Sequence, residues 1–241
     1  FHEPIAFIFA WLFGITKGYK YLLTRRVQRP PRSNFINKAI YLNANSIVTL
    51  SKAIGDSIET ALGSEIDYEV IPSAKTGFIP NESEVKRVKS TLEGNFIVGH
   101  IGELDDSHKG QQQIIELAKS MQVSEPDINF LLIGSGRDSK QLKQQSEGLE
   151  NLKFIGQIDN VGDYLALFDV FIFPSRHEGL GSILLDAMDF GLPILGSNMG
   201  GIPELIEDGV NGFLVDVNNI QVYKDALYKI YRDKELRANI Q

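Results

Sequence analysis

Two carboxylates in the second half of the sequence are spaced so that both can face one ligand. Glu178 lies in a predicted loop, and Asp186 follows eight residues later. At ~100° per residue, two helical turns bring the two side chains to roughly the same side of a helix. Carboxylates only accept hydrogen bonds, and sugar hydroxyls are donors that occur in pairs. The pair therefore fits a sugar, whereas an isolated pair of this kind would more often be a helix cap and a solvated side chain.

Glycines next to Glu178 add a backbone feature to this stretch. Gly179, Leu180 and Gly181 come after a predicted strand that ends at Pro174, and a predicted helix follows them. Glycine lets the backbone approach a ligand closely, and the unpaired amides at the start of a helix favour anions. The segment is therefore expected to bind an anionic ligand.

Three other candidate residues also follow predicted strands. Lys109 comes after the strand at 96–101, and a compact lysine cation suits phosphate, although a lone lysine at a helix start is usually only solvated. Gly134 follows the strand at 129–133 and lets the chain turn close to a ligand. Ile158 follows the strand at 152–155.

Short apolar runs alternate with helical patterns along most of the chain, which predicts an α/β fold. Such alternation implies parallel strands joined by right-handed crossovers, hence an open sheet covered on both faces. Ligands of such sheets lie beyond the carboxyl ends of the strands, where the candidate residues fall. Strands are predicted at 46–50, 68–71, 96–101, 129–133, 152–155, 170–174, 193–196 and 212–215, with helices near 51–62, 109–121, 138–147, 161–168, 181–190, 201–207 and 219–232.

Residues 76–83 have no regular period and contain Gly and Pro, so they are predicted to be a linker. We expect an incomplete N-terminal α/β domain over 1–80 and a Rossmann-like domain over 81–241.

Composition and charge exclude several classes of protein. The 241 residues contain no cysteine, which excludes disulfides, thiolate metal sites and a cysteine nucleophile. Residues 1–38 hold seven Lys or Arg and one Glu, and the remaining residues hold 17 basic and 30 acidic side chains. This acidic body argues against nucleic acid as a partner.

The first thirty residues combine an apolar run with a basic one. Residues 5–15 are almost wholly apolar, but eleven residues are too few to span a bilayer, which needs about 20 in a helix. A helix that continues to the prolines at 28–33 is expected. Residues 5–32 then form either a buried helix with a basic end or a helix that binds an anionic membrane surface.

The stretch at 174–204 resembles the donor-binding half of the family 4 glycosyltransferases, which are retaining enzymes of the GT-B fold. Their hallmark is two Glu residues separated by seven others, inside a pattern of glycines and prolines. The resemblance extends at lower density from about residue 43 to 232. The matching residues are Pro174, Ser175, Glu178, Gly179, Gly181, Gly191, Pro193, Gly200, Gly201, Pro203, Glu204, Asn211 and Gly212.

The resemblance implies a role for each candidate residue. Glu178 would face the transferred sugar as a catalytic residue, and Asp186 would bind the ribose hydroxyls of the nucleotide. The backbone amides of 179–181 would meet the sugar and phosphate, and Lys109 the diphosphate. Gly134 would line the donor site, and the backbone near Ile158 would contact the base.

Two positions depart from the family pattern. Glu103 stands where the family usually has an arginine, and this removes one cation from the diphosphate site. Asp186 replaces the second glutamate and shortens its reach by about 1.5 Å.

His2 is the last candidate, because the family has a catalytic histidine just after an N-terminal strand. The other histidines show no metal-ligand spacing with carboxylates, so neither a metal nor another cofactor is expected.

The predicted function is transfer of a sugar from a nucleotide sugar to a saccharide or lipid-linked acceptor, without a metal and with retention. A sugar-nucleotide epimerase and a non-catalytic nucleotide-sugar-binding domain are the alternatives. The chain starts without Met inside an apolar run, so we expect it to be a fragment that is inactive alone. The expected location is cytoplasmic, with peripheral attachment to the inner face of the membrane as an added possibility.

Overall fold

The computed structural model describes residues 4–92 and 95–240, and its contacts form two compact units. Unit 1 comprises Phe1–Ser73 and His177–Gly181, and unit 2 comprises Ala74–Arg176 and Ser182–Gln241. The sequence-based boundary lies after residue 80, whereas the linker residues 74–80 group with unit 2.

Unit 2 is built on a parallel sheet of six strands, which confirms the α/β class. The strand order is β6-β5-β4-β7-β8-β9, and every neighbouring pair is parallel. All residues of β4, β5, β7 and β8 are buried, which explains why these strands are mostly apolar and do not alternate between apolar and polar residues. The strands are β4 (Phe96–Ile101), β5 (Ile128–Ile133), β6 (Leu152–Gly156), β7 (Val170–Phe173), β8 (Ile194–Ser197) and β9 (Gly212–Val215).

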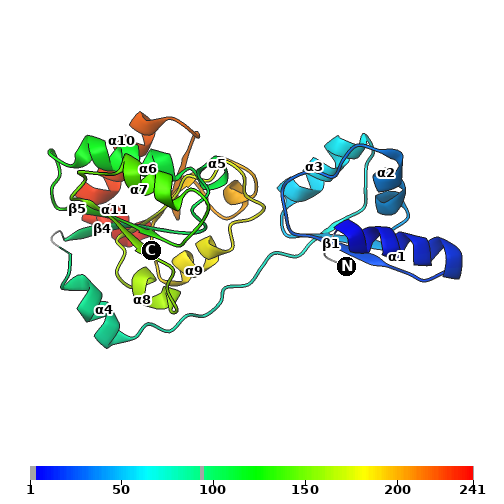
Figure 1. The fold of residues 1–241 in the computed structure, drawn as a ribbon, viewed down its shortest axis with the longest axis horizontal. Coiled ribbons are helices and arrows are strands. Elements are labelled where there is room, and N and C mark those ends of the chain that lie inside the picture. The colour runs from blue at the N-terminus through cyan, green and yellow to red at the C-terminus, as the bar shows by residue number, and fades with distance from the viewer. Residues whose placement is uncertain (1–3, 93–94, 241) are drawn as a thin grey trace. The chain divides into compact units, whose positions relative to one another are not determined.

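Helices cover both faces of this sheet (Figure 1). On one face, α6 (Gln111–Met121), α7 (Ser139–Gln145) and α10 (Ile220–Arg232) pack in one apolar cluster. On the other face, α4 (Glu82–Lys89), α8 (Val161–Leu165) and α9 (Ile183–Asp189) pack in a second cluster. The sheet is therefore accessible mainly at its edges and at its strand ends. The remaining short elements are α5 (Asp106–Lys109), the 3-10 turn η1 (Ile202–Glu204) and α11 (Lys234–Ile240).

Unit 1 has a smaller parallel sheet with the order β1-β2-β3. Its core joins the sheet to the three helices and includes Leu23, Ile40, Ile54 and Ile58, all at most 1% exposed. The elements are α1 (Pro4–Lys17), β1 (Leu22–Arg25), α2 (Phe35–Leu42), β2 (Ser46–Thr49), α3 (Lys52–Leu62) and β3 (Glu69–Val70).

The expected long N-terminal helix is wrong. The helix α1 ends at Lys17, where Gly18 takes a positive φ of 69°, and the chain continues as β1. The strand pairs in register with β2, so tertiary pairing outweighs the helix-like composition of this segment. Within the described residues, no helix combines the length and apolar character needed to cross a bilayer.

His100 is a buried polar residue at the centre of unit 2. It is 0% exposed, and its Nδ1 lies 3.0 Å from the carbonyl oxygen of Ile172 while its Nε2 lies 3.2 Å from Nε2 of Gln111. The neutral ring satisfies both contacts if Nδ1–H donates to Ile172 and Nε2 accepts from Gln111. Burial lowers the pKa of His100 to about 4, and the charge of Lys109 acts in the same direction.

We predict that unit 2 loses stability as the pH falls from 6.5 to 4. In this window the unfolded chain binds a proton at His100 that the folded chain does not bind, which contributes a slope of about 1.4 kcal/mol per pH unit. In urea unfolding at pH 5 and pH 7, the free energy of unfolding should therefore change less with pH in His100→Gln than in the wild type. The exposed His177 provides the control His177→Gln, which should keep the wild-type slope. An unchanged slope in His100→Gln would contradict the buried neutral ring.

Candidate functional site

The loop after β4 carries two of the singled-out residues, Glu103 and Lys109, and is fixed by charged contacts. Arg137 donates to Asp105 at 2.7 Å and to Ser107 at 2.5 Å, and Asp138 accepts from the backbone N–H of Asp106 at 2.8 Å. Burial acts to raise the pKa of Asp105, but the hydrogen bonds from Ser107 and Arg137 outweigh it and hold the pKa below its ordinary value. The short helix α5 is thereby held at the carboxyl end of β4.

Lys109 lies at the point where the strand order of the sheet reverses. From β4 the chain proceeds outward to β5 and β6, and from β7 it proceeds in the other direction to β8 and β9. Lys109 ends the loop after β4, and its Nζ lies 5.4 Å from the ring centroid of Phe173, the last residue of β7. The backbone N–H of Arg176, just beyond β7, donates to the carbonyl of His108 at 2.7 Å. Such a switch point is the usual ligand position in open α/β sheets.

A cavity of about 250 Å³ lies beside this point, at the carboxyl ends of β4, β5 and β6. Two sequence-predicted residues, Gly134 and Ile158, line it together, and Glu103 is a third lining residue. Two of the lining residues, Gly102 and Gly134, are glycines, which leave polar main-chain groups uncovered by side chains. The complete lining is Ile101, Gly102, Glu103, Ile133, Gly134, Ser135, Gln157, Ile158 and Val161.

Gly134 is required by the close approach of two loops. Its φ is 132°, and a Cβ at this position would overlap the backbone carbonyl of Gly102 after β4. The backbone N–H of Gly134 donates to the carbonyl of Gly156 at 2.8 Å, which ties the loop to β6 as well. Gly134 thus closes the wall of the cavity.

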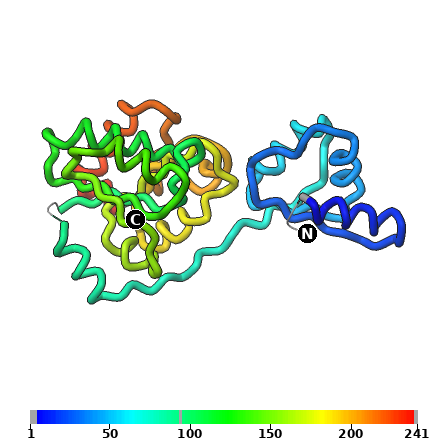
Figure 2. The backbone as a smooth tube through the Cα atoms, viewed as in Figure 1, coloured from blue at the N-terminus to red at the C-terminus, as the bar shows by residue number. Residues whose placement is uncertain are grey.

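Asp186 is 5% exposed and is held by the linker. Its Oδ1 accepts from the backbone N–H of Thr76 at 2.6 Å, and its Oδ2 accepts from the Thr76 hydroxyl at 3.2 Å. Lys75 forms an ion pair with Asp189 on the same helix, α9. The extended segment 74–81 (Figure 2) is also fixed farther on, where the N–H of Asn81 donates to Asp163 at 2.6 Å. The linker is thus fastened to unit 2 through Asp186.

The segment 177–181 belongs to unit 1 by its contacts, so Glu178, Gly179, Leu180 and Gly181 are described there. Gln28 accepts from the backbone N–H of Glu178 at 2.8 Å, and the Ser51 hydroxyl donates to the carbonyl of Gly179 at 2.5 Å. Gly179 and Leu180 are buried, and a Cβ on Gly179 would crowd the carbonyl of Arg26. Their backbone is therefore fixed by protein contacts.

Gly134 and Ile158 thus line one cavity, and Lys109 lies at the switch point. Asp186 is hydrogen-bonded to Thr76. The shared crevice expected for Lys109, Glu178 and Asp186 stays a prediction. His2 lies outside the described residues. In the part of the chain that is described, no three His, Asp or Glu side chains are grouped so as to hold a metal ion.

Thr76 is the contact residue that sequence reasoning missed. The segment 76–83 was recognisable only as a linker, because a hydrogen bond to a carboxylate 110 residues away leaves no local pattern.

The model of the family described as "Glycosyl transferases group 1" matches residues 82–241, which are about two thirds of the chain. The chain belongs to this family. The match begins at α4 and includes the whole six-stranded sheet, hence the switch point and the cavity beside it.

Individual relatives are similar to part of the chain. The N-acetyl-alpha-D-glucosaminyl L-malate synthase of Bacillus anthracis is 31% identical over 161 residues, which are 66% of this chain and 42% of that protein. The phosphatidyl-myo-inositol mannosyltransferase of Mycobacterium leprae is 30% identical over 57% of this chain and 37% of its own length. The matched regions thus span less than half of either relative.

Solved structures of other group 1 and related proteins share the fold. HepE of Anabaena, in complex with UDP and glucose, matches with a TM-score of 0.84 at 22% identity over 99% of this chain and 69% of that one. The C-terminal domain of the group 1 protein LpcC of Francisella tularensis matches with a TM-score of 0.61 at 28% identity over 70% of this chain and 92% of that one. The fold class, that of the GT-B glycosyltransferases, is confirmed.

Replacement of Gly134 should lower the stability of unit 2 more than replacement of another glycine with positive φ. In Gly134→Ala both the backbone strain and the overlap with Gly102 must be relieved, so we expect a loss of roughly 3 kcal/mol or more in urea unfolding. The control is Gly148→Ala, whose φ is 82° but whose Cβ meets nothing within 4 Å, so strain alone costs about 1 kcal/mol. Equal losses of stability in the two variants would show that the loops at Gly134 and Gly102 do not approach each other closely.

Proposed function

We propose that this chain carries the nucleotide-sugar site of a glycosyltransferase that acts with retention, without a metal or other cofactor, on a saccharide or lipid-linked acceptor. The observation that carries the proposal is a lysine at the switch point together with a cavity, lined in part by two glycines, at the carboxyl ends of the neighbouring strands. Family membership supports the reaction class.

The chemistry of the donor explains why these groups suit it. A nucleoside diphosphate leaves with negative charge, which a nearby ammonium group and backbone amides stabilise. Lys109 supplies the cation, and the cavity lined by Gly134 and Ile158 has room for part of the nucleotide. In this proposal Glu178 faces the transferred sugar, and it stabilises the positive character that develops at the anomeric carbon. Positioning accounts for most of the rate enhancement.

The relatives are consistent with a nucleotide-sugar donor. HepE of Anabaena has been crystallised in complex with UDP-glucose, and the Mycobacterium leprae relative is named as a mannosyltransferase. For this chain the sugar is proposed to be a hexose type, and the acceptor site to involve unit 1. We propose a cytoplasmic enzyme that attaches peripherally to the inner face of the membrane, and that the 241 residues alone do not turn over.

The contact between Asp186 and Thr76 favours a second candidate, a domain that binds nucleotide sugars without catalysis. The carboxylate proposed for the ribose already accepts two hydrogen bonds from the linker. Each carboxylate oxygen has a further lone pair, so ribose binding remains compatible with this contact. Turnover by a longer protein that contains this chain would separate the candidates, because a binding domain gives none.

The exposed Glu103 provides a sharp test of the diphosphate site. Glu103→Arg exchanges repulsion for attraction at the cavity, so we expect UDP to bind at least about fivefold more tightly, and the gain to shrink at high salt. Uridine, which lacks the phosphates, should bind both proteins equally. Calorimetric titration of the full chain measures both ligands.

The matched control is Glu147→Arg, which makes the same charge change at an exposed residue before β6, at the opposite end of the strand. Its affinity for UDP should stay within about twofold of wild type. The proposal fails if both variants gain equally in affinity for UDP, or if the affinity for uridine rises as much as that for UDP.

A further inference from the structure

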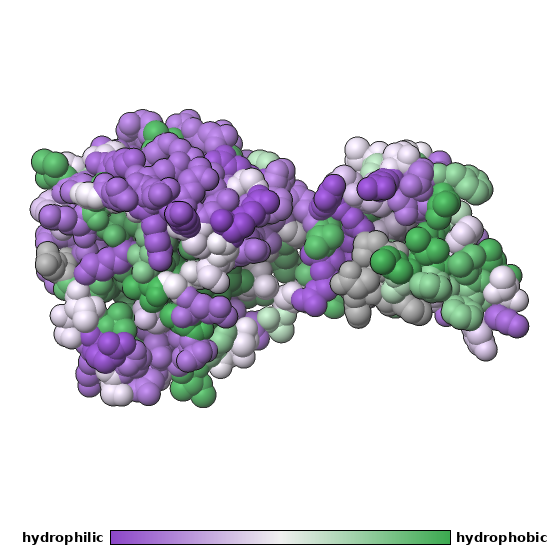
Figure 3. Space-filling view, viewed as in Figure 1, coloured by the Kyte–Doolittle hydropathy of each residue, from purple (hydrophilic) through white to green (hydrophobic). Residues whose placement is uncertain are grey.

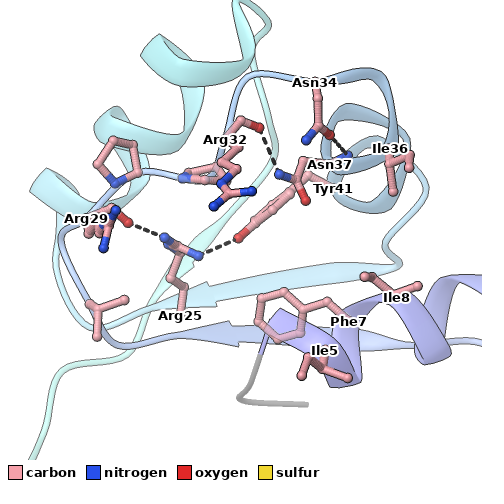
Figure 4. A pocket seen from close by; sticks show the side chains of 13 residues that line it. Ile5, Phe7, Ile8, Arg25, Arg29, Arg32, Asn34, Ile36, Asn37 and Tyr41 are labelled. Carbon is pink, nitrogen blue, oxygen red and sulfur yellow. Dashed lines mark hydrogen bonds between the residues drawn. The ribbon is translucent and has the colours of Figure 1, made fainter.

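Unit 1 contains a cavity of about 530 Å³ with two chemically different walls (Figure 4). The apolar wall includes Ile5, Phe7 and Ile8 of α1, and the facing wall carries three arginines, Arg25, Arg29 and Arg32. The volume lies within the ~300–1,000 Å³ typical of small-molecule sites. The other lining residues are Val27, Pro30, Pro31, Asn34, Ile36, Asn37 and Tyr41.

Arg25 is a buried cation whose hydrogen-bonding capacity is only partly used. It is 8% exposed, its Nη1 donates to the Tyr41 hydroxyl at 2.9 Å, and its Nη2 donates to the carbonyl of Arg29. Its buried Nε–H has no hydrogen-bond partner among the described residues. The bonds to Tyr41 and Arg29 use two of the five N–H groups of the guanidinium, so an acceptor in the cavity that Arg25 lines would pair with donors that remain.

No acidic side chain balances this charge in the surrounding sequence. Residues 4–55 contain eight Lys or Arg and no Asp or Glu, and the thirteen residues that line the cavity include no carboxylate. In Figure 4 the guanidinium groups of Arg25 and Arg32 point toward the same space. Guanidinium groups bind phosphate through paired N–H donors. The cationic wall therefore fits a phosphate.

The apolar wall fits a hydrocarbon chain. Phe7 packs edge-on against Tyr41, with 6.1 Å between their ring centroids, and this contact joins α1 to the basic wall. The outer surface of α1 is also hydrophobic (Figure 3), with Ile5 71%, Phe9 56% and Phe13 52% exposed. An apolar ligand that leaves the cavity would thus continue along apolar surface.

We propose that this cavity binds the phosphate-bearing end of a single lipid molecule, with the phosphate at Arg25 and Arg32 and the chain against α1. The proposal concerns unit 1 alone, so it holds or fails independently of the nucleotide-sugar site in unit 2.

Dodecyl phosphate below its micelle-forming concentration is a suitable probe for calorimetric titration of the full chain. We expect saturable binding with one molecule per chain. Dodecanol lacks the charge and inorganic phosphate lacks the chain, so each should bind at least about tenfold more weakly. Equal binding of dodecanol, or equal binding of inorganic phosphate, would overturn the proposal.

Two matched pairs of variants locate the site. Arg32→Gln removes an exposed arginine that lines the cavity and should weaken binding about tenfold, whereas Arg26→Gln, at an exposed arginine outside the lining, should change it less than about twofold. Ile8→Ser should weaken binding about fivefold, whereas Ile15→Ser, on the same helix but outside the lining, should not.

Adsorption to a membrane surface is the competing explanation. It predicts binding to anionic vesicles that falls equally in Arg32→Gln and Arg26→Gln, without a stoichiometric complex with dodecyl phosphate. That pattern would overturn the proposal, because diffuse charge and not the cavity would then bind the lipid.

Discussion

The candidate site depends on how closely the backbone loops approach one another at the carboxyl ends of the strands in unit 2. A Cβ on Gly134 would overlap the carbonyl of Gly102, and one on Gly110 would overlap that of Pro174. These contacts hold the loops after β5 and β7 against the loop after β4, where the strand order reverses. Because these contacts are made by glycines, backbone groups lie at the strand ends beside the side chains of Glu103, Ser135 and Lys109. The same constraint explains why glycine recurs directly after strands in this sequence.

The linker contact of Asp186 joins α9 to the chain that leads into unit 2. Thr76 donates one hydrogen bond to each carboxylate oxygen of Asp186, and the neighbouring Lys75 pairs with Asp189. A ribose bound at Asp186, as proposed, would share or displace the hydrogen bonds from Thr76 and would so change how the linker is held. In the proposed function, nucleotide-sugar binding and the linker contact of Thr76 therefore depend on the same carboxylate.

The sequence predicted the unit 2 strands well, because the central ones are buried, are mostly apolar and are followed by glycine, proline or polar residues. It did not predict β1, whose four residues lie in a basic and aromatic stretch and become a strand through pairing with β2. The helices α2 and α4 were also missed, although Asn34 and Asn81 cap them. Gly134 and Ile158 could be placed from strand ends, whereas the partner of Asp186 and the unpaired N–H of Arg25 depend on tertiary contacts.

The central claim is that the carboxyl ends of β4, β5 and β6 bind a nucleoside diphosphate. The most direct measurement is a titration of the isotope-labelled chain with UDP, in which amide NMR shifts are followed residue by residue. The account predicts saturable shifts at the cavity, above all at Gly102, Ser135 and Ile158, and at Lys109 beside it. Shifts confined to the opposite ends of the strands, or none at millimolar UDP, would contradict it.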